Sequence, residues 1–164
     1  MIKEAETFFD AQEGKLHGKN ILRVKKRLKD LKGVFSDVEK FEAQDMEKIA
    51  YEVEMHSPIE GIEGGLYFGI STIHPGKVGE EFFMTKGHFH EVRNRAEYYW
   101  GIAGTGILLL VDEDGKKRKE KVICGSLHYI PGNVAHRLIN VGEEKLVVGA
   151  CWPSDAGHDY AAFE

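Results

Sequence analysis

Between residues 49 and 152 the chain consists of short runs rich in β-branched and aromatic residues, separated by residues that form turns. Pro75-Gly76, Asp114-Gly115 and Pro131-Gly132-Asn133 are three of these separators. Closely spaced strands without helices between them predict an all-β sandwich or barrel. The predicted strands cover residues 49–55, 66–73, 81–85, 96–102, 106–112, 116–123, 127–130, 135–140 and 145–152.

A basic segment ahead of the strands has the periodicity of a helix. Its apolar residues recur at intervals of three, four and three positions, which predicts one apolar stripe over residues 21–33. Asn20 can cap the start of this helix, and Gly33 suits a left-handed residue at its end. We interpret its lysines and arginines as a solvated face rather than an anion-binding surface. The residues of the stripe are Ile21, Val24, Leu28 and Leu31.

A second, shorter helix is predicted over residues 37–43. Ser36 stands three residues before Glu39, which is the spacing of a capping box. Residues 1–19 are punctuated by glycine, and we expect an extended arm or short strands there. The chain is thus predicted to form a single structural domain, in which residues 1–48 are an arm and helices packed on a β-barrel of residues 49–164.

Charge and cysteine content exclude several classes of protein. The 164 residues carry a formal net charge of −5, which does not favour a nucleic-acid partner. No apolar run approaches the length of a membrane span, and residues 1–12 lack the features of a secretory signal. The two cysteines, Cys124 and Cys151, do not have the spacing of a zinc knuckle or a disulfide framework. We therefore expect a cytoplasmic protein without a membrane or nucleic-acid partner.

Residues 85–97 contain side chains from which a metal site can be built. His88 and His90 are one residue apart, so in a strand their side chains point to the same face, and Glu97 follows with a carboxylate. A turn at residues 131–133 precedes His136, and a jelly-roll barrel can bring this hairpin against the first segment. Three imidazoles and one carboxylate suit Fe(II), Mn(II), Ni(II), Co(II) or Zn(II), with positions left open for substrate or water.

The two segments resemble the paired motifs of the cupin superfamily. The second motif is carried by Gly125, Pro131, His136 and Asn140 at the usual spacing. Asn133 replaces its last glycine, and Phe82 stands where the first motif commonly has glycine. Six residues separate His90 from Glu97, where three or four are common. The resemblance implies a cupin jelly-roll β-barrel, to which we add a short helical N-terminal appendage.

A narrower resemblance accounts for the long gap before Glu97. The runs TKGHFH at residues 85–90 and DAGHDY at residues 155–160 are similar to those of the archaeal, cupin-type glucose-6-phosphate isomerases, although Trp152 stands where tyrosine is usual. This resemblance implies interconversion of glucose 6-phosphate and fructose 6-phosphate by a homodimer with one divalent metal per subunit, for which Fe(II) is our first choice. The metal ligands that it implies are His88, His90, Glu97 and His136.

The same resemblance implies a binding pocket for the sugar phosphate in the barrel mouth. The implied phosphate contacts and pocket residues are Ser71, Thr85, Lys86, Gly87, His158 and Tyr160. Hydroxyl groups, a lysine and a glycine N–H can hold a phosphate without a glycine-rich nucleotide loop. Tyr99 shares a strand face with Glu97, and we predict that it lines the cavity too. The other histidines are interpreted as ordinary surface or core residues: His17, His56, His74 and His128.

Glu97 is the only carboxylate that the motifs place in the site, so it is our first choice for the group that carries a proton between C1 and C2 of the sugar. A nearby cation lowers the basicity of a carboxylate, so Glu97 can instead be a ligand only, with a metal-assisted hydride shift as the competing route. Two further classes stay open at this point. They are a metal-dependent cupin dioxygenase and a non-catalytic cupin that binds a sugar phosphate.

Overall fold

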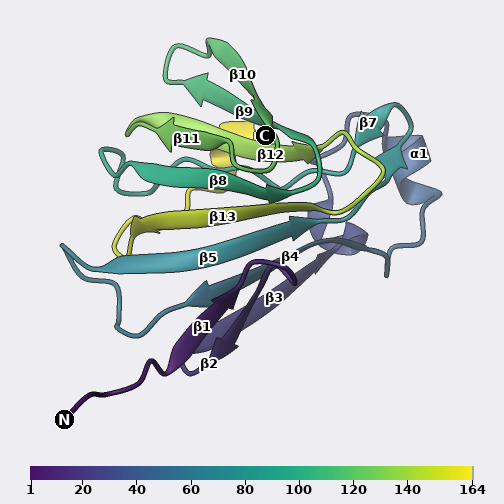
Figure 1. Cartoon of the computed structure of the whole chain (residues 1–164). Coiled ribbons are helices and arrows are strands. Elements are labelled where there is room, and N and C mark those ends of the chain that lie inside the picture. The colour runs from purple at the N-terminus through teal and green to yellow at the C-terminus, as the bar shows by residue number, and fades with distance from the viewer. Residues whose placement is uncertain (164) are drawn as a thin grey trace.

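Two antiparallel β-sheets enclose the core of the molecule (Figure 1). The computed structural model describes residues 1–163. The larger sheet has the strand order β11-β8-β13-β5-β4-β3 and contains β3 (Ile21–Arg27), β4 (Ile49–His56), β5 (Leu66–Ile73), β8 (Glu97–Ala103), β11 (Leu127–Ile130) and β13 (Leu146–Pro153). The smaller sheet has the order β10-β9-β12 and contains β9 (Gly106–Asp112), β10 (Lys117–Val122) and β12 (Val134–Asn140). This is the predicted all-β cupin barrel.

Shorter elements complete the chain. Two hairpins are formed by β1 (Thr7–Asp10) with β2 (Lys15–Gly18) and by β6 (Lys77–Val78) with β7 (Glu81–Phe82). The helical elements are η1 (Leu28–Leu31), α1 (Val38–Glu42) and η2 (Tyr160–Phe163). None of the described helices is long and apolar enough to cross a membrane.

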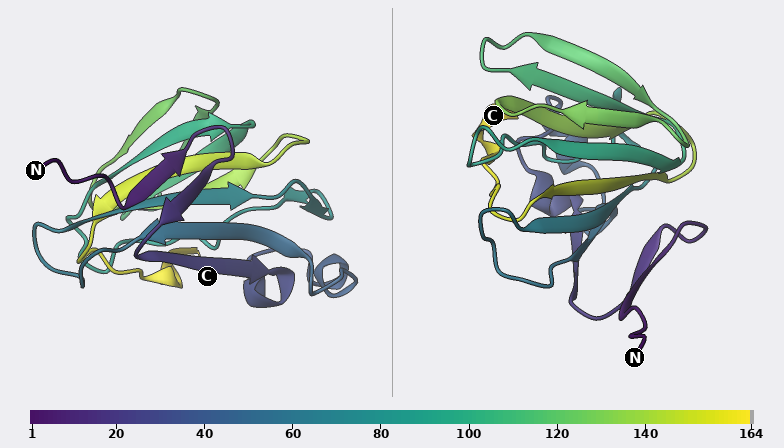
Figure 2. Two further views of the ribbon diagram at one scale, coloured as in Figure 1. Left: turned by 60° about the horizontal axis from the view of Figure 1, so that its bottom comes forward. Right: turned by 60° about the vertical axis from the view of Figure 1, so that its left-hand side comes forward.

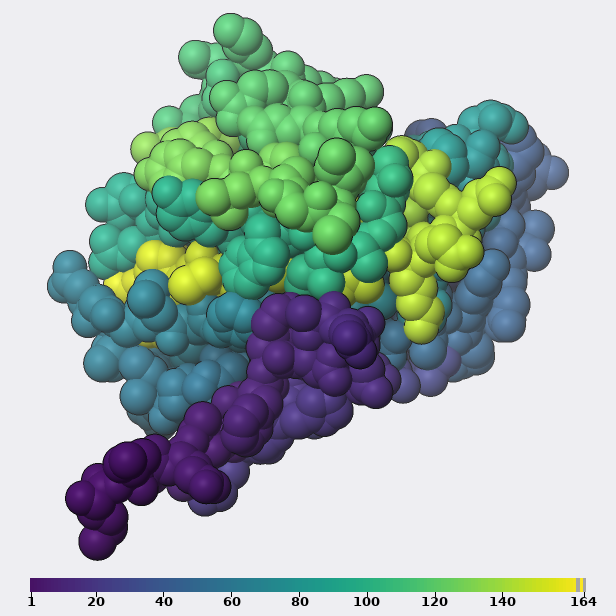
Figure 3. Space-filling view, viewed as in Figure 1, coloured from purple at the N-terminus to yellow at the C-terminus, as the bar shows by residue number. Residues whose placement is uncertain are grey.

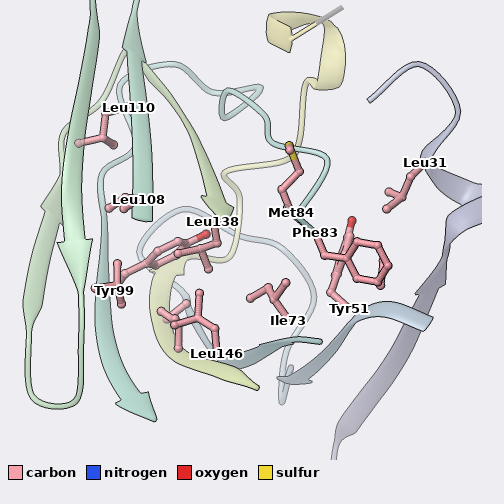
Figure 4. Close-up of a cluster of buried hydrophobic side chains, with 14 of the residues drawn as sticks. Leu31, Tyr51, Ile73, Phe83, Met84, Tyr99, Leu108, Leu110, Leu138 and Leu146 are labelled. Carbon is pink, nitrogen blue, oxygen red and sulfur yellow. The ribbon is translucent and has the colours of Figure 1, made fainter. Parts of the chain in front are cut away.

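The core lies between the two sheets because alternate residues of each strand point inward (Figure 4). Leu108 of β9 and Leu138 of β12 face Ile73 of β5 and Leu146 of β13, and all four are at most 2% exposed. Full burial of such a side chain contributes roughly 1.5–3 kcal/mol. The sheets are therefore held together by residues whose alternation is visible in the sequence.

The prediction of a helix over residues 21–33 is wrong. Residues 21–27 form β3, which pairs with β4 over its whole length, and only Leu28–Leu31 form a single 3₁₀ turn. Val24, which the predicted apolar stripe would bury, is 47% exposed. A partner strand far along the chain offers a complete hydrogen-bond ladder, and this outweighs the weak local preference for helix.

The helical appendage is accordingly small. Helix α1 has Asp37 as its cap, because the Asp37 carboxylate accepts a hydrogen bond from the N–H of Lys40 at 3.0 Å. Ser36, the predicted cap, instead donates to the carboxylate of Glu81 through its N–H and its hydroxyl, both at 2.8 Å. The larger sheet also crosses the predicted boundary between residues 48 and 49, so that division of the chain stays a prediction.

The predicted strand at residues 81–85 is shorter than expected. Only Glu81–Phe82 forms a regular strand, and the chain then runs along β12 through isolated bridges from Met84 to Ile139 and from His88 to His136. The other predicted strands agree with the observed ones to within one residue at either end.

The β1–β2 hairpin packs on the outer face of the larger sheet (Figures 2 and 3). Leu16 is 2% exposed there, in contact with Ile70 and Val147, which point away from the barrel interior. The hairpin covers the lower part of this face in the view of Figure 3 and leaves the surface over β8 and β11 open. The expectation of short strands in residues 1–19 is confirmed.

Candidate active site

The four predicted metal ligands come together inside the barrel. His88 and His136 face each other across an antiparallel bridge, with N–O distances of 3.2 and 3.0 Å in the two directions. Glu97 is the first residue of β8, and His90 follows His88 on the same side of the chain, with 5.6 Å between their ring centroids. One ligand-competent atom from each of the four lies within 4.8 Å of the others.

The polar atoms of this cluster are buried and converge without pairing with one another. Nε2 of His90, Nε2 of His136 and Oε1 of Glu97 are inaccessible to solvent and have no hydrogen-bond partner. The His136 Nε2 and Glu97 Oε1 atoms are only 2.5 Å apart, yet the imidazole is not oriented to donate to the carboxylate. Buried polar atoms without partners are costly, and a cation at their common centre would satisfy all of them. The cluster therefore fits a metal ion.

The backbone fixes the orientation of His90. Its Nδ1 lies 2.7 Å from the carbonyl oxygen of Arg95, so the ring N–H donates there and the lone pair of Nε2 points into the cluster. Burial lowers the pKa of His90, and it lowers the pKa of His88 far below its ordinary value, with the neighbouring imidazole of His136 adding to the effect on His88. Both rings are thus held neutral, which is the form that binds a metal.

A cavity of about 230 Å³ opens beside the cluster. Glu97, His88 and His136 line its inner end. All the other predicted pocket residues line it as well, namely Ser71, Thr85, Lys86, Gly87, Tyr99, His158 and Tyr160. The structure thus gathers in one pocket predicted residues from five separate parts of the sequence: Ser71, residues 85–88, residues 97–99, His136 and residues 158–160. Burial and the nearby Glu97 carboxylate raise the pKa of Tyr99 well above its usual value, so its hydroxyl stays protonated.

Residues 85–87 are fixed against β12. The Arg137 guanidinium donates to the carbonyl oxygen of Lys86 through Nε at 3.2 Å and Nη2 at 2.5 Å. Burial lowers the pKa of Arg137 to about 10, so it stays charged at neutral pH. Thr85 accepts a hydrogen bond from the N–H of Leu138 and keeps its own hydroxyl proton free to donate. Gly87 has φ +77, and a Cβ there would meet the Phe163 ring at 2.7 Å, so only glycine fits.

The C-terminal segment is held over the pocket by backbone pairing and ion pairs. Phe89 and Asp159 exchange two N–H···O bonds of 2.9 Å, and the Arg93 guanidinium pairs with the Asp159 carboxylate. Arg95 makes a bidentate contact with Asp155, at 3.0 and 2.7 Å. These contacts bring the ring of His158 to 4.4 Å from that of His88, centroid to centroid. The Tyr160 ring lies 5.9 Å from each of these two rings and is 10° from parallel to that of His158.

Asn133 explains one departure from the motif pattern. It adopts φ +62, the left-handed conformation for which the usual motif glycine is suited. Asparagine tolerates this conformation better than most other residues, so the turn before His136 is kept.

Among the lining residues that were not predicted from the sequence, three have polar or aromatic side chains: Lys26, Tyr51 and Trp152. Burial raises the pKa of Tyr51 to about 12. The alternation of residues 49–55 places Tyr51 on one face of β4, but the sequence does not say that this face borders the pocket. The Trp152 indole packs over Gly69 of the neighbouring strand, where a Cβ would lie 2.8 Å from it.

The remaining histidines lie outside this pocket. His128 is buried between Glu120 and Ser126, His74 contacts Glu52 at 2.9 Å, and His17 lies near Glu13. Asp10, Glu13 and His17 also hold ligand-competent atoms close together. That group is on the surface, and the Asp10 carboxylate already accepts two backbone N–H groups.

Comparison with known proteins gives consistent matches. A family model described as glucose-6-phosphate isomerase (GPI) matches residues 25–164. The glucose-6-phosphate isomerase of Thermococcus kodakarensis is 41% identical over 157 residues, which are 94% of this chain and 81% of that protein. The glucose-6-phosphate isomerase of Pyrococcus horikoshii is 41% identical over 154 residues, which are 92% of this chain and 79% of that protein.

Solved structures agree on the fold. Oxalate decarboxylase from Bacillus subtilis superposes with a TM-score of 0.51 and 22% sequence identity, over 65% of this chain and 26% of that one. A further structure of that enzyme, described by its Mn(II) centres, has a TM-score of 0.52 and covers 70% of this chain and 28% of that one. At this level of identity the likeness concerns the barrel alone.

Proposed function

Because the chain belongs to the glucose-6-phosphate isomerase family, it is an aldose–ketose isomerase, and we propose that it interconverts glucose 6-phosphate and fructose 6-phosphate at the pocket described above. The reaction serves glycolysis in one direction and gluconeogenesis in the other. The observation that carries the assignment to this pocket is the group of buried, unpaired donor atoms at its inner end, next to residues that can hold a phosphate.

We propose that His88, His90, Glu97 and His136 hold one divalent metal per subunit, with Fe(II) as the first choice and Mn(II), Ni(II), Co(II) or Zn(II) as the other candidates. When bound, the metal would act as a Lewis acid on the sugar oxygens. Three imidazoles and a carboxylate form a donor set of the kind that these ions accept.

We assign the proton transfer between C1 and C2 to Glu97. It is the one carboxylate among the described residues that line the cavity, and it is only 5% exposed. Its position at the start of β8 is fixed by pairing with Ile130 of β11. Tyr99 lies two residues further along the same face and keeps its proton, so its hydroxyl can donate to the carboxylate or to a sugar oxygen.

Other residues of the same pocket suit the phosphate. Ser71 and Thr85 offer hydroxyl protons, Lys86 offers an ammonium group and Gly87 a backbone N–H. His158 and Tyr160 border the same space from the C-terminal segment. We propose that the phosphate binds here, which leaves the C1–C2 end of the open-chain sugar at Glu97.

The decisive experiment is conversion of glucose 6-phosphate to fructose 6-phosphate before and after chelation, with each candidate metal added back. We expect activity to vanish on chelation and to return with Fe(II) and at least one other ion. Full activity in a protein shown to be free of metal would refute the metal assignment. Oxygen consumption without isomerisation would favour a dioxygenase, and binding without turnover would favour a non-catalytic protein.

Isomerisation in deuterated water tests the role of Glu97. A proton carried by its carboxylate exchanges with solvent, so deuterium is expected at C2 of glucose 6-phosphate or C1 of fructose 6-phosphate. Complete retention of the substrate hydrogen would instead support a hydride shift and leave Glu97 as a ligand only.

We further propose a cytoplasmic homodimer. The surface over β8 and β11 carries Tyr98, Leu127 and Tyr129, which are 47%, 67% and 54% exposed, and the two tyrosine rings lie 5.3 Å apart. An apolar sheet face of this kind is suited to a second copy of the chain. Both cysteines are free thiols, which suits a reducing compartment. Sedimentation of the wild-type protein and of Leu127→Glu tests the dimer; a wild-type monomer would refute it.

A further inference from the structure

The cations of β3 divide between the two faces of the larger sheet. Arg23 and Lys25 point outward, where Arg23 pairs with Glu54 at 3.2 Å and Lys25 with Glu52 at 3.4 Å. Lys26 points the other way because side chains alternate along a strand, and it lines the cavity together with Val24. In the part of the chain that the structure describes, Lys26 takes part in no ion pair. A half-buried ammonium group thus faces the pocket without a counterion.

A second unpaired lysine lies at the same end of the pocket. Lys26 is opposite Tyr51 in the β3–β4 ladder. The backbone N–H of Lys86 lies at the Tyr51 hydroxyl and lowers the pKa of that group, which partly offsets the rise caused by burial. Lys86 has no carboxylate partner among residues 1–163; its Nζ lies 5.0 Å from the centre of the Tyr160 ring. Lys26 and Lys86 therefore both border Tyr51 from two separate elements, and both line the cavity.

The strand that carries Lys26 is separated from the strand that carries Glu97. Strand β3 is the edge of the larger sheet, and β13, β5 and β4 stand between it and β8, which carries Glu97. Arg137 is committed to the carbonyl oxygen of Lys86. The cations left to face a ligand in the cavity are thus the two lysines.

The charge of a phosphate ester favours contact with more than one cation. A phosphate monoester carries a charge of about −1.5 to −2 at neutral pH. The proposed divalent metal would already offset the Glu97 carboxylate. Lys26 and Lys86 are then the cations lining the pocket that can contact the phosphate itself.

We propose that Lys26 is a phosphate-binding residue that acts with Lys86, so that the edge strand β3 forms part of the substrate site. The inference rests on the proposed function for the identity of the phosphate carrier. It also implies that the pocket selects phosphorylated over unphosphorylated sugars through the charges of Lys26 and Lys86. The sequence pattern instead predicts that the cations of residues 21–33, which include Lys26, form a solvated face.

The test compares Lys26→Met with Lys25→Met in the metal-loaded protein. Methionine keeps the length of the side chain and removes its charge, and Lys25 is the matched control because it points to the outer face. We expect KM for fructose 6-phosphate and the inhibition constant of inorganic phosphate to rise at least about 10-fold in Lys26→Met, with kcat changed less than about 3-fold. Lys25→Met should leave both within about 2-fold of wild type, and Lys26→Arg should restore most of the loss.

The outcomes separate this inference from the proposed function. An active wild type whose KM and phosphate inhibition are unchanged in Lys26→Met would overturn the role of Lys26 and leave the isomerase assignment intact. A wild type that converts no sugar phosphate would overturn the assignment itself. In that case calorimetric titration with inorganic phosphate still decides on Lys26, because equal affinity in wild type and Lys26→Met would refute it and weaker binding in the variant would support it.

Discussion

Two groups of histidine and carboxylate lie in the same barrel, and they differ in whether their polar atoms have partners. In the first, formed by His88, His90, His136 and Glu97, three buried atoms have no hydrogen-bond partner. In the second, His128 contacts the Glu120 carboxylate through Nδ1 at 2.7 Å and the Ser126 hydroxyl through Nε2 at 2.9 Å. His128 and His90 are almost equally buried, at 6% and 5% exposed.

The difference shows that burial of a histidine near a carboxylate does not by itself indicate a site. Both ring nitrogens of His128 are satisfied within the protein, so the group stabilises the fold and needs no ligand. Ser126 cannot act as an activated nucleophile either, because its hydroxyl donates to the carbonyl oxygen of Ile123 at 2.7 Å. At the first group the fold leaves donor atoms unsatisfied, and a ligand has to supply the missing partner.

The substitution His136→Ala should separate the two groups most strongly. Loss of one of four ligands is expected to weaken metal binding by at least about 100-fold, since even an outer partner of a ligand contributes 10- to 100-fold. Isomerase activity should be lost together with the metal, as measured by elemental analysis of the purified variant and by turnover. A variant that is free of metal and fully active would break the comparison.

Removal of the metal should lower the stability of the wild-type protein. At a free metal concentration 100 times Kd, binding to the folded state contributes about 2.7 kcal/mol to the free energy of unfolding. Thermal unfolding with and without chelator measures the shift. His128→Gln should show the same shift as wild type, because its ligand cluster is intact, and His136→Ala should show almost none.

His128→Ala should have the opposite profile, with reduced stability and retained metal. The change removes the buried imidazole and its contacts to Glu120 and Ser126, which keep Arg118 and Ile123 as partners, and it opens a cavity. We therefore expect a loss of about 2 kcal/mol in urea unfolding. Metal content and kcat should stay near wild type. His128→Gln can still donate to Glu120 and is expected to lose less. Loss of metal in a folded His128→Ala protein would contradict a purely structural role.

A smaller effect is expected in the dependence of stability on pH, and it comes from the Asp155 carboxylate. The guanidinium of Arg95 holds the pKa of Asp155 below its ordinary value of 3.8. The stabilisation from the ionised Asp155 is complete above the unfolded-state pKa and is lost as pH falls through the lower folded-state pKa. Asp155→Asn should therefore make stability less dependent on pH below about 4.

The same variant probes the position of His158. At neutral pH Asp155→Asn weakens the hold on the C-terminal segment, and we expect kcat/KM to fall by roughly 10-fold with the metal retained. Lys19 and Glu6 form an ion pair on the surface of the hairpin, so Lys19→Met is a control for loss of an exposed pair. Equal effects of the two variants would mean that Asp155 does not position the site.

The fold was predictable where residues within a strand decide it. Alternation placed Leu108, Leu138 and Leu146 inside, and the turns at residues 114–115 and 131–133 marked where strands end. The prediction failed over residues 21–33, because a three-and-four spacing of apolar residues also occurs in a strand that continues into a 3₁₀ turn. Pairing of β3 with β4 decides the structure there, and it joins segments separated by the whole of η1 and α1.

The sequence by itself determined which residues can ligate a metal, because their chemistry and motif spacing are local properties that the chain carries into any fold. Only the tertiary structure decided that His90, His136 and Glu97 stay unpaired while His128 is satisfied, since each outcome depends on the neighbours that other strands supply. It also decided that Lys26 and Tyr51 face the pocket, because the direction of a side chain depends on which strand pairs with which.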